Sequence, residues 1–405
     1  MWMSLQMEQR TSGTNETQNP LILELLAIAQ NESRVQVKLM EHVEYRLHKS
    51  FLLYVPPAIY LVGVVGNLLS FTVLARKRMR RVSTYTYLAV LSVADTFVLT
   101  IGLLMLWFGQ LTGKDVRARY AWSCKLLNVF SYTASDFSVW LIIAVTVERF
   151  IAVCYPLQAA SMCTHRTAMR VVIGIFALVL GFNLNFIWTT NLQLIAIDVD
   201  YNAIYQCSAA DGFDVFVNKV WPWIDAVLYS SLPFGIILLL NALIIRRVIQ
   251  ARRSRNHGLA SGRRSTDRVG LRRRAGGNSV AVGGSKTAGG ETNTTLSLML
   301  LTITCAFLVM TLPMNVMLIA AAFWKDLSGD TFHRRAKFHL AKTVSELLMY
   351  VNHSINFFLY CGTGQKFRQE LCALLCRWNG KTKNKSDPRS ISFNMTPKHS
   401  VIVYH

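Results

Sequence analysis

Acidic residues and cysteines are both scarce in this sequence of 405 residues. It has 22 Asp and Glu against 43 Lys and Arg, which gives a formal net charge of +21, and it has only 8 cysteines. So few cysteines in so long a chain exclude a scaffold built from disulfides. Charged residues make up only 16% of the chain and hydrophobic residues 52%. The mean hydropathy of +0.31 is too high for an ordinary soluble domain.

Motifs that carry catalytic chemistry are also missing. The sequence shows no nucleophile paired with a base, no glycine-rich phosphate loop and no metal-ligand cluster, so we expect no enzyme and no resident cofactor. So basic a chain could bind nucleic acid. However, its positive residues gather in three segments, at about 76–81, 252–274 and 377–385. This distribution argues against nucleic acid and is typical of loops on one side of a membrane.

Seven stretches are apolar over about 20 residues or more, the length a helix needs to cross a bilayer. Helices satisfy their own backbone groups in lipid, so the sequence predicts an all-α membrane protein, a seven-transmembrane helix bundle. The predicted spans are 52–76, 84–108, 122–154, 167–190, 219–247, 295–323 and 338–361.

The basic loops orient this bundle. Positive loops stay in the cytoplasm, which predicts a multi-pass protein of the plasma membrane with its N-terminus outside. The predicted organisation is an extracellular tail over 1–50, a transmembrane domain over 51–378 and a cytoplasmic tail over 379–405. Within the domain, the Arg-, Gly- and Ser-rich loop 251–293 has too few large apolar residues to fold and is predicted to be disordered.

Orientation in turn predicts covalent modifications. Asn15 and Asn31 begin glycosylation tripeptides on the outer side. Cys124 and Cys207 are the cysteines that face the oxidising side, so we expect them to form a disulfide. Residues 364–378 carry Phe367, Leu371, Leu374 and Leu375 at helical spacing, which predicts a short amphipathic helix on the inner leaflet. Its Cys372 and Cys376 are either palmitoylated or free cytosolic thiols.

Four polar side chains lie deep inside the predicted spans, where such residues are functional candidates. Oxygen-bearing side chains at similar depth on three helices can hold a hard cation such as sodium. They can equally form a hydrogen-bonded network without an ion, and the sequence leaves both interpretations open. The four are Asp95, Ser138, Asn352 and Asn356.

Short motifs recur in a fixed order along the spans. They are Gly66-Asn67, Leu91-Ser92-Val93-Ala94-Asp95, Cys124, Glu148-Arg149-Phe150, Pro233, Phe307, Pro313 and Asn356-Phe357-Phe358-Leu359-Tyr360. Taken together, this set resembles the rhodopsin-like G-protein-coupled receptors over roughly residues 50–378. The resemblance implies a receptor that activates a heterotrimeric G protein and that arrestin and receptor kinases regulate.

The resemblance also implies an activation switch. Glu148 and Arg149 interrupt an apolar stretch, where burying two charges is costly. In the family, the acidic residue pairs with the arginine at rest, and activation frees the arginine to contact the G protein. Tyr360 resembles the tyrosine that turns inward in the active state. The remaining switch residues are Phe307, Pro313 and Asn356.

Four positions depart from the family pattern. Thr311 stands for the usual tryptophan of span six, Phe357 for the proline of span seven, Asn241 for the tyrosine of span five and Phe176 for the tryptophan of span four. These changes leave the level of basal signalling open. A constitutive or decoy receptor of the same fold is therefore an alternative.

Two outer positions argue against common ligand classes. Ser131 occupies the place of the aspartate of amine receptors, and Tyr350 that of the retinal-binding lysine of opsins. The outer half instead holds three carboxylates, which need a cation or a proton. A ligand arginine, lysine or amine could supply it, although Lys342 lies one turn from Glu346 and is an internal rival. With Ser131, the predicted ligand-binding residues are Asp136, Asp225 and Glu346.

The loop at about 191–218 strengthens the expectation of a basic ligand. It holds Asp198, Asp200, Asp211 and Asp214 and no Lys or Arg, so it would steer basic molecules to the entrance; it could also be a solvated loop. The spans resemble invertebrate neuropeptide receptors, including FMRFamide-type ones, so the predicted ligand is a short basic neuropeptide, either amidated or with a free carboxylate. The alternatives are a non-peptide ligand and a cation transporter, although the sequence lacks the internal repeats typical of transporters.

Overall fold

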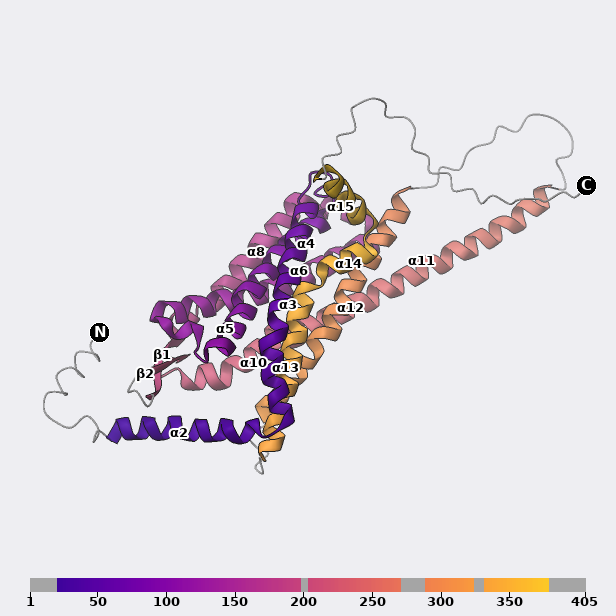
Figure 1. Cartoon of the computed structure of the whole chain (residues 1–405). Helices are drawn as coiled ribbons and strands as arrows, with labels where there is room; N and C mark the ends of the chain where they lie inside the picture. Colours follow the sequence, from indigo (N-terminus) through magenta and orange to yellow (C-terminus); the bar gives the residue numbers. More distant parts are fainter. Residues whose placement is uncertain (1–19, 198–202, 271–287, 324–330, 379–405) are drawn as a thin grey trace, which may run out of the picture.

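The structure is a computed structural model that describes residues 20–197, 203–270, 288–323 and 331–378. Within these residues, seven long helical rods lie side by side in one bundle (Figure 1). A two-stranded hairpin lies toward one end of the bundle, and the short helix α15 lies at the other (Figure 1). We call these ends the hairpin end and the α15 end.

Several of the rods are divided by π-helical segments (η2, η4, η5) or by a break. In order, the rods are α3 (Val43–Leu74); α4 (Ser83–Phe97), η2 (Val98–Leu103) and α5 (Leu104–Thr112); α6 (Ala121–Cys154); α8 (His165–Asn183) and α9 (Phe186–Thr189); η4 (Phe216–Val220), α10 (Trp221–Asp225), η5 (Ala226–Ser231) and α11 (Leu232–Gly270); α12 (Ala288–Phe323); and α13 (Phe332–Ser354) and α14 (Asn356–Thr363). The short helices η3 (Val116–Arg119) and α7 (Pro156–Met162) lie in connections.

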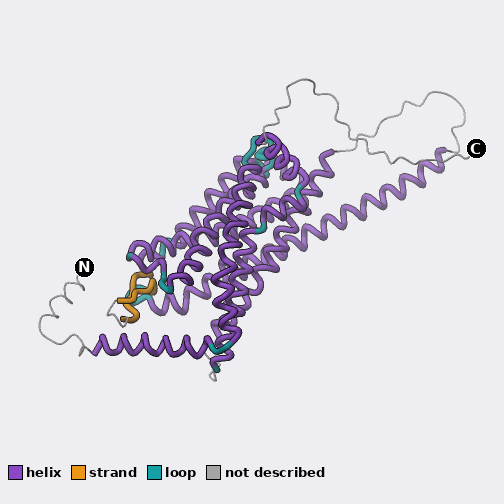
Figure 2. The backbone as a smooth tube through the Cα atoms, viewed as in Figure 1, coloured by secondary structure: helices purple, strands orange, loops and turns teal. Residues whose placement is uncertain are grey.

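Among the described residues, six rods are long and apolar enough to cross a membrane. The seventh, α13 with α14, is more polar because it carries Arg334, Arg335 and Lys337 near its start and breaks at Ile355. The predicted seven-helix bundle is confirmed. Figure 2 shows strand only in the hairpin, in which β1 (Thr190–Ile197) pairs antiparallel with β2 (Ala203–Ala209).

The largest buried cluster lies in the half of the bundle toward the α15 end. Side chains from several rods meet there, because each rod turns an apolar stripe inward. Leu88, Val139, Ile237, Met299 and Tyr360 are nearly or fully buried members of this cluster. The outward faces keep their large apolar side chains exposed, as expected for helices that face lipid.

The N-terminal boundary differs from the prediction. Residues 1–50 were expected to form a polar tail, yet α2 (Pro20–Met40) is helical and α3 begins at Val43. The reason is packing: Leu39, Tyr45 and Ala336 form a small buried cluster where α2, α3 and α13 meet. In Figure 1, α2 runs to the ends of α3 and α13.

The predicted disorder of 251–293 is also wrong in part. α11 continues to Gly270 and α12 begins at Ala288, so 251–270 and 288–293 are helical, while 271–287 lie outside the described residues. Arginine is a good helix former, and a helix already nucleated in the membrane extends at little cost. A low content of large apolar residues therefore did not exclude a helix in these two parts.

The amphipathic helix after the seventh span is confirmed as α15 (Gln365–Trp378). Phe367 is 1% exposed and packs on the Tyr360 ring at 5.4 Å between centroids. Glu370 pairs with Arg76 at 3.1 Å and with Arg78 at 3.2 Å, which ties α15 to the loop after α3. Leu375 does not share the packed face, because it is 46% exposed.

Candidate functional site

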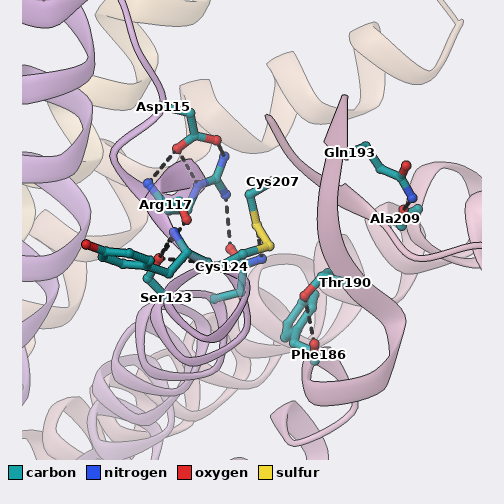
Figure 3. The surroundings of a disulfide bond; sticks show 11 residues. Asp115, Arg117, Ser123, Cys124, Phe186, Thr190, Gln193, Cys207 and Ala209 are labelled. Atoms are coloured by element: carbon teal, nitrogen blue, oxygen red, sulfur yellow. Dashed lines mark hydrogen bonds and ion pairs between the residues drawn. A yellow bond between two sulfur atoms is a disulfide. The ribbon is translucent and has the colours of Figure 1, made fainter. Parts of the chain in front are cut away.

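The predicted disulfide between Cys124 and Cys207 is present and joins the start of α6 to β2 (Figure 3). Leu192 of β1 lies opposite Cys207 in the hairpin, so the bond holds the whole hairpin over the bundle. Asn128 donates from Nδ2 to the Cys207 Sγ at 3.3 Å. The hairpin is thereby fixed in place at this end of the bundle.

A hydrogen-bond network that the sequence did not reveal supports this disulfide. Arg117 donates to both carboxylate oxygens of Asp115 at 3.0 Å and to the Asn128 Oδ1 at 3.0 Å (Figure 3). The hydroxyl of Ser123 donates to the backbone oxygen of Arg117 at 2.9 Å. This network extends from the connection before α6 to the hairpin.

Of the predicted ligand-binding carboxylates, Asp225 and Glu346 are half-buried. Asp225 lies close enough to Tyr229 to interact electrostatically, and Tyr350 is near both Tyr229 and Glu346. Residues of α10, η5 and α13 thus converge. Among the described residues, no Lys or Arg lies within ion-pair distance of Asp225 or Glu346. Lys342 is near Glu346 without pairing with it.

Asp136 differs from these two carboxylates. It is 7% exposed, and its Oδ2 accepts a hydrogen bond of 2.8 Å from Asn183 of α8. Asn183 is fully buried and also donates to the backbone oxygen of Val179. Asp136 therefore pins α6 to α8, which weakens its predicted ligand role. Ser131, five residues earlier on α6, is half-buried.

The aromatic side chains of the hairpin half are partly buried and partly exposed. Trp221 is 4% exposed and packs against Phe186 at 4.8 Å and Phe182 at 5.3 Å between ring centroids. Trp188 and Trp223 are about half exposed.

Asp95 lies at the centre of a buried network between α4, α6 and the α13–α14 junction. Its Oδ1 accepts from Ser138 at 2.6 Å and lies 2.8 Å from the Nδ1 of His353, and its Oδ2 accepts from Asn356 at 2.7 Å. The sequence analysis missed His353. It had named Asn352, yet among the described residues no hydrogen bond links Asn352 to Asp95.

These residues do not fit the predicted sodium cage. Sodium needs oxygen ligands, but a nitrogen of His353 lies where an oxygen was expected, and both carboxylate oxygens already have partners. The neutral Nδ1–H tautomer of His353 can donate to Asp95 and needs no ion. The hydrogen-bonded network, the alternative interpretation, agrees with this geometry.

The predicted switch pair lies buried toward the α15 end. Arg149 Nη2 is 3.4 Å from Glu148 Oε1, and the two side chains are only 8% and 7% exposed. Thr84 of α4 donates from its hydroxyl to the same Glu148 oxygen, a contact that the sequence analysis did not find. Glu148 is therefore held from two helices. Burial raises the pKa of the nearby Cys163 thiol, in the connection before α8.

Of the other switch residues, Phe307, Asn356 and Tyr360 are buried, whereas Pro313 is half-buried. Phe307 is 2% exposed, and Thr311 donates to its backbone oxygen at 2.7 Å. Asn241 donates to Thr304 at 2.8 Å, which links α11 to α12. Tyr360 is fully buried, and Pro313 lies inside α12.

The predicted modification sites lie in different surroundings. Asn31 is exposed on α2, and Asn15 lies outside the described residues, as do Asp198 and Asp200. Cys372 and Cys376 are both exposed on α15.

The chain was compared with known proteins. A family model described as 7 transmembrane receptor (rhodopsin family) matches residues 66–360. The chain is similar to an FMRFamide receptor of Drosophila melanogaster, with 24% identity over 327 residues that cover 76% of this chain and 51% of that protein. It therefore spans about half the length of that relative.

Two further relatives are named after other peptides. The Galanin-like G-protein coupled receptor npr-9 of Caenorhabditis elegans is 25% identical over 320 residues, which cover 77% of this chain and 70% of that protein. The Thyrotropin-releasing hormone receptor of Homo sapiens is 29% identical over 147 residues, 36% of each chain.

Proposed function

Because the chain belongs to the rhodopsin family of seven-transmembrane receptors, we propose that it is a receptor for a short basic neuropeptide. The ligand binds from outside the cell at the hairpin end, and a heterotrimeric G protein binds at the α15 end. The receptor lies in the plasma membrane with its N-terminus outside. The observation that carries the ligand class is the pair of half-buried carboxylates, Asp225 and Glu346, that no described cation neutralises.

The chemistry of that pair favours an arginine. A carboxylate in low-dielectric surroundings gains most from a charge-assisted hydrogen bond, and guanidinium offers two donors in a fork. The name FMRFamide of the Drosophila relative denotes a peptide with one arginine and an amidated end. A peptide of this type supplies one cation, brings no C-terminal carboxylate and adds aromatic groups.

The surroundings at the hairpin end support the same ligand. Asp211 and Asp214 are exposed close to the disulfide-bonded hairpin, where they would attract a basic molecule before it docks. The exposed Trp188 and Trp223 offer apolar surface to peptide aromatic groups.

A signalling assay tests the receptor function. Cells that express the chain are challenged with a peptide library in amidated and free-acid forms, and calcium and cyclic AMP are recorded. We expect a response to one peptide class that Arg149→Ala abolishes at equal surface expression. Silence to every peptide would reject the peptide ligand, and high signalling without peptide would favour a constitutive receptor.

A double-mutant cycle tests the carboxylates. The active peptide and its citrulline analogue, which removes the charge but keeps the shape, are compared on the natural chain, Asp225→Asn and Glu346→Gln. We expect the carboxylate that binds the arginine to account for roughly a 10- to 150-fold difference in potency. The citrulline peptide should not distinguish that variant from the natural chain. Equal losses with both peptides would mean that neither carboxylate binds the arginine.

A further inference from the structure

Two histidines and a glutamate meet at the hairpin end, at the junction of α2, α3 and α13. The ligand atoms of His42, Glu44 and His333 all lie within 4.8 Å of one another. His333 Nδ1 lies 3.8 Å from Glu44 Oε1. The rings of His42 and His333 are 5.4 Å apart between centroids. The sequence analysis saw no such cluster, because His333 is far from the other two along the chain.

Rigid helices hold the three residues in place. His42 is the N-cap of α3, Glu44 lies in the first turn of α3, and His333 is the second residue of α13. The buried cluster of Leu39, Tyr45 and Ala336 packs directly beneath them. The backbone NH of His42 donates to the Leu39 oxygen at 3.0 Å, which fixes the turn between α2 and α3.

The donor set is the one that zinc prefers. Two imidazole nitrogens and one carboxylate oxygen hold zinc tetrahedrally, with a fourth position left for water. With ligands about 2.1 Å from the metal, they lie about 3.4 Å from one another, so side-chain rotation alone can close the present spacing. Calcium and magnesium need mostly oxygen ligands and do not fit.

The cluster is open to a hydrated ion. The side chain of His333 is 51% exposed and that of Glu44 is 25% exposed. Nearby positive charge opposes binding: Arg334 and Lys337 lie on the same helix, and two helix N-termini point at the cluster. Glu44 supplies one balancing negative charge. The site therefore suits reversible binding rather than permanent structural zinc.

We propose that His42, Glu44 and His333 form a zinc-binding site that clamps the first and seventh spans together at the hairpin end. Below it, Tyr45 and His339 continue the α3–α13 contact with ring centroids 5.6 Å apart, and His48 Nδ1 lies 2.6 Å from the Thr343 hydroxyl. Zinc would join α3 and α13 at the hairpin end of this contact.

Binding is tested on the purified full-length receptor, isolated through an affinity tag without histidine. Zinc is titrated into the natural chain, His42→Ala, His333→Ala and the near-isosteric Glu44→Gln. Cobalt is added separately, because its visible absorption reports tetrahedral coordination. His339→Ala is the matched control, a histidine of the same helix contact outside the cluster.

We expect one zinc to bind the natural chain and His339→Ala alike and to raise the midpoint of thermal unfolding. Each of the three cluster variants should bind at least about tenfold more weakly and lose the cobalt absorption. Equal zinc binding by the natural chain and all three cluster variants would overturn the proposal. A natural chain that binds no zinc at millimolar concentration would overturn it as well.

Discussion

Aspartates in two regions of the bundle have opposite surroundings. Asp95, near the middle of its rod, is fully buried, and Ser138, His353 and Asn356 surround its carboxylate. Asp225, in the hairpin half, is half-buried without an ion pair among the described residues. The first region is closed on itself, whereas the second leaves a negative charge to be met from outside.

This difference predicts a structural role for Asp95 and a role in ligand recognition for Asp225. A buried carboxylate whose partners are all internal stabilises one arrangement of helices. A carboxylate whose partners are missing costs stability until a ligand arrives, and that cost becomes binding specificity. The same residue type therefore has opposite expected effects when it is replaced in the two regions.

The largest expected effect comes from one substitution made at both places. Asp95→Asn turns an amide NH2 toward groups that donate, so it should lower the free energy of unfolding by about 3 kcal/mol. Asp225→Asn removes a charge without a partner and should leave stability unchanged or raise it. Thermal unfolding of the two purified variants measures both. Equal shifts in the same direction would erase the distinction between the regions.

A second prediction concerns Asp136, which lies in the same half as Asp225 but has an internal partner. Asn183→Leu removes the donor that holds Asp136 and should destabilise the protein by about 2 kcal/mol, since a buried acceptor loses its hydrogen bond. Asn191→Leu, on the surface hairpin, is the control. Unfolding midpoints measure the effect, and no change in Asn183→Leu would restore Asp136 as a free ligand-binding carboxylate.

The third prediction tests the hydrogen bond from Thr84 to Glu148. Thr84→Val keeps the shape but removes the hydroxyl that donates to Glu148. The loss of about 1 kcal/mol should raise signalling without ligand by roughly fivefold. Thr72→Val, whose hydroxyl bonds only its own helix, should not change it. Cyclic AMP or calcium without ligand measures the difference, and equal basal signalling in both variants would contradict it.

The smallest expected effect is that sodium leaves agonist affinity unchanged. If His353 completes the Asp95 network, replacing sodium by choline outside the cell should not change agonist affinity. His353→Asn replaces the imidazole by an oxygen ligand and should create sodium dependence. Binding curves in sodium and in choline measure both chains. Sodium dependence of the natural chain would restore the predicted ion site.

Much of this architecture followed from the sequence. Apolar length predicted the bundle, and the location of Cys124 and Cys207 on the oxidising side predicted their bond. Contacts across helices did not follow. Asn352 and His353 are neighbours, but one residue turns a helical side chain by about 100°. Depth along the helix alone could not show which of them meets Asp95.

Two other differences have the same origin. The π-helical segment η5 follows Asp225 directly, and an i→i+5 turn alters which residues face inward. Composition does not reveal such a segment. The pairing of Asp136 with Asn183 and the meeting of His333 with His42 both join distant parts of the chain. Tertiary packing, which local patterns do not encode, brings them together.

Two buried polar atoms near the α15 end give the bundle a built-in bias. Among the described residues, nothing hydrogen-bonds to Arg149 Nε or to the Tyr360 hydroxyl, and both atoms are shielded from solvent. Each such group costs about 1–3 kcal/mol. Any rearrangement that gives both atoms a partner recovers this energy, which would offset part of the cost of opening the bundle.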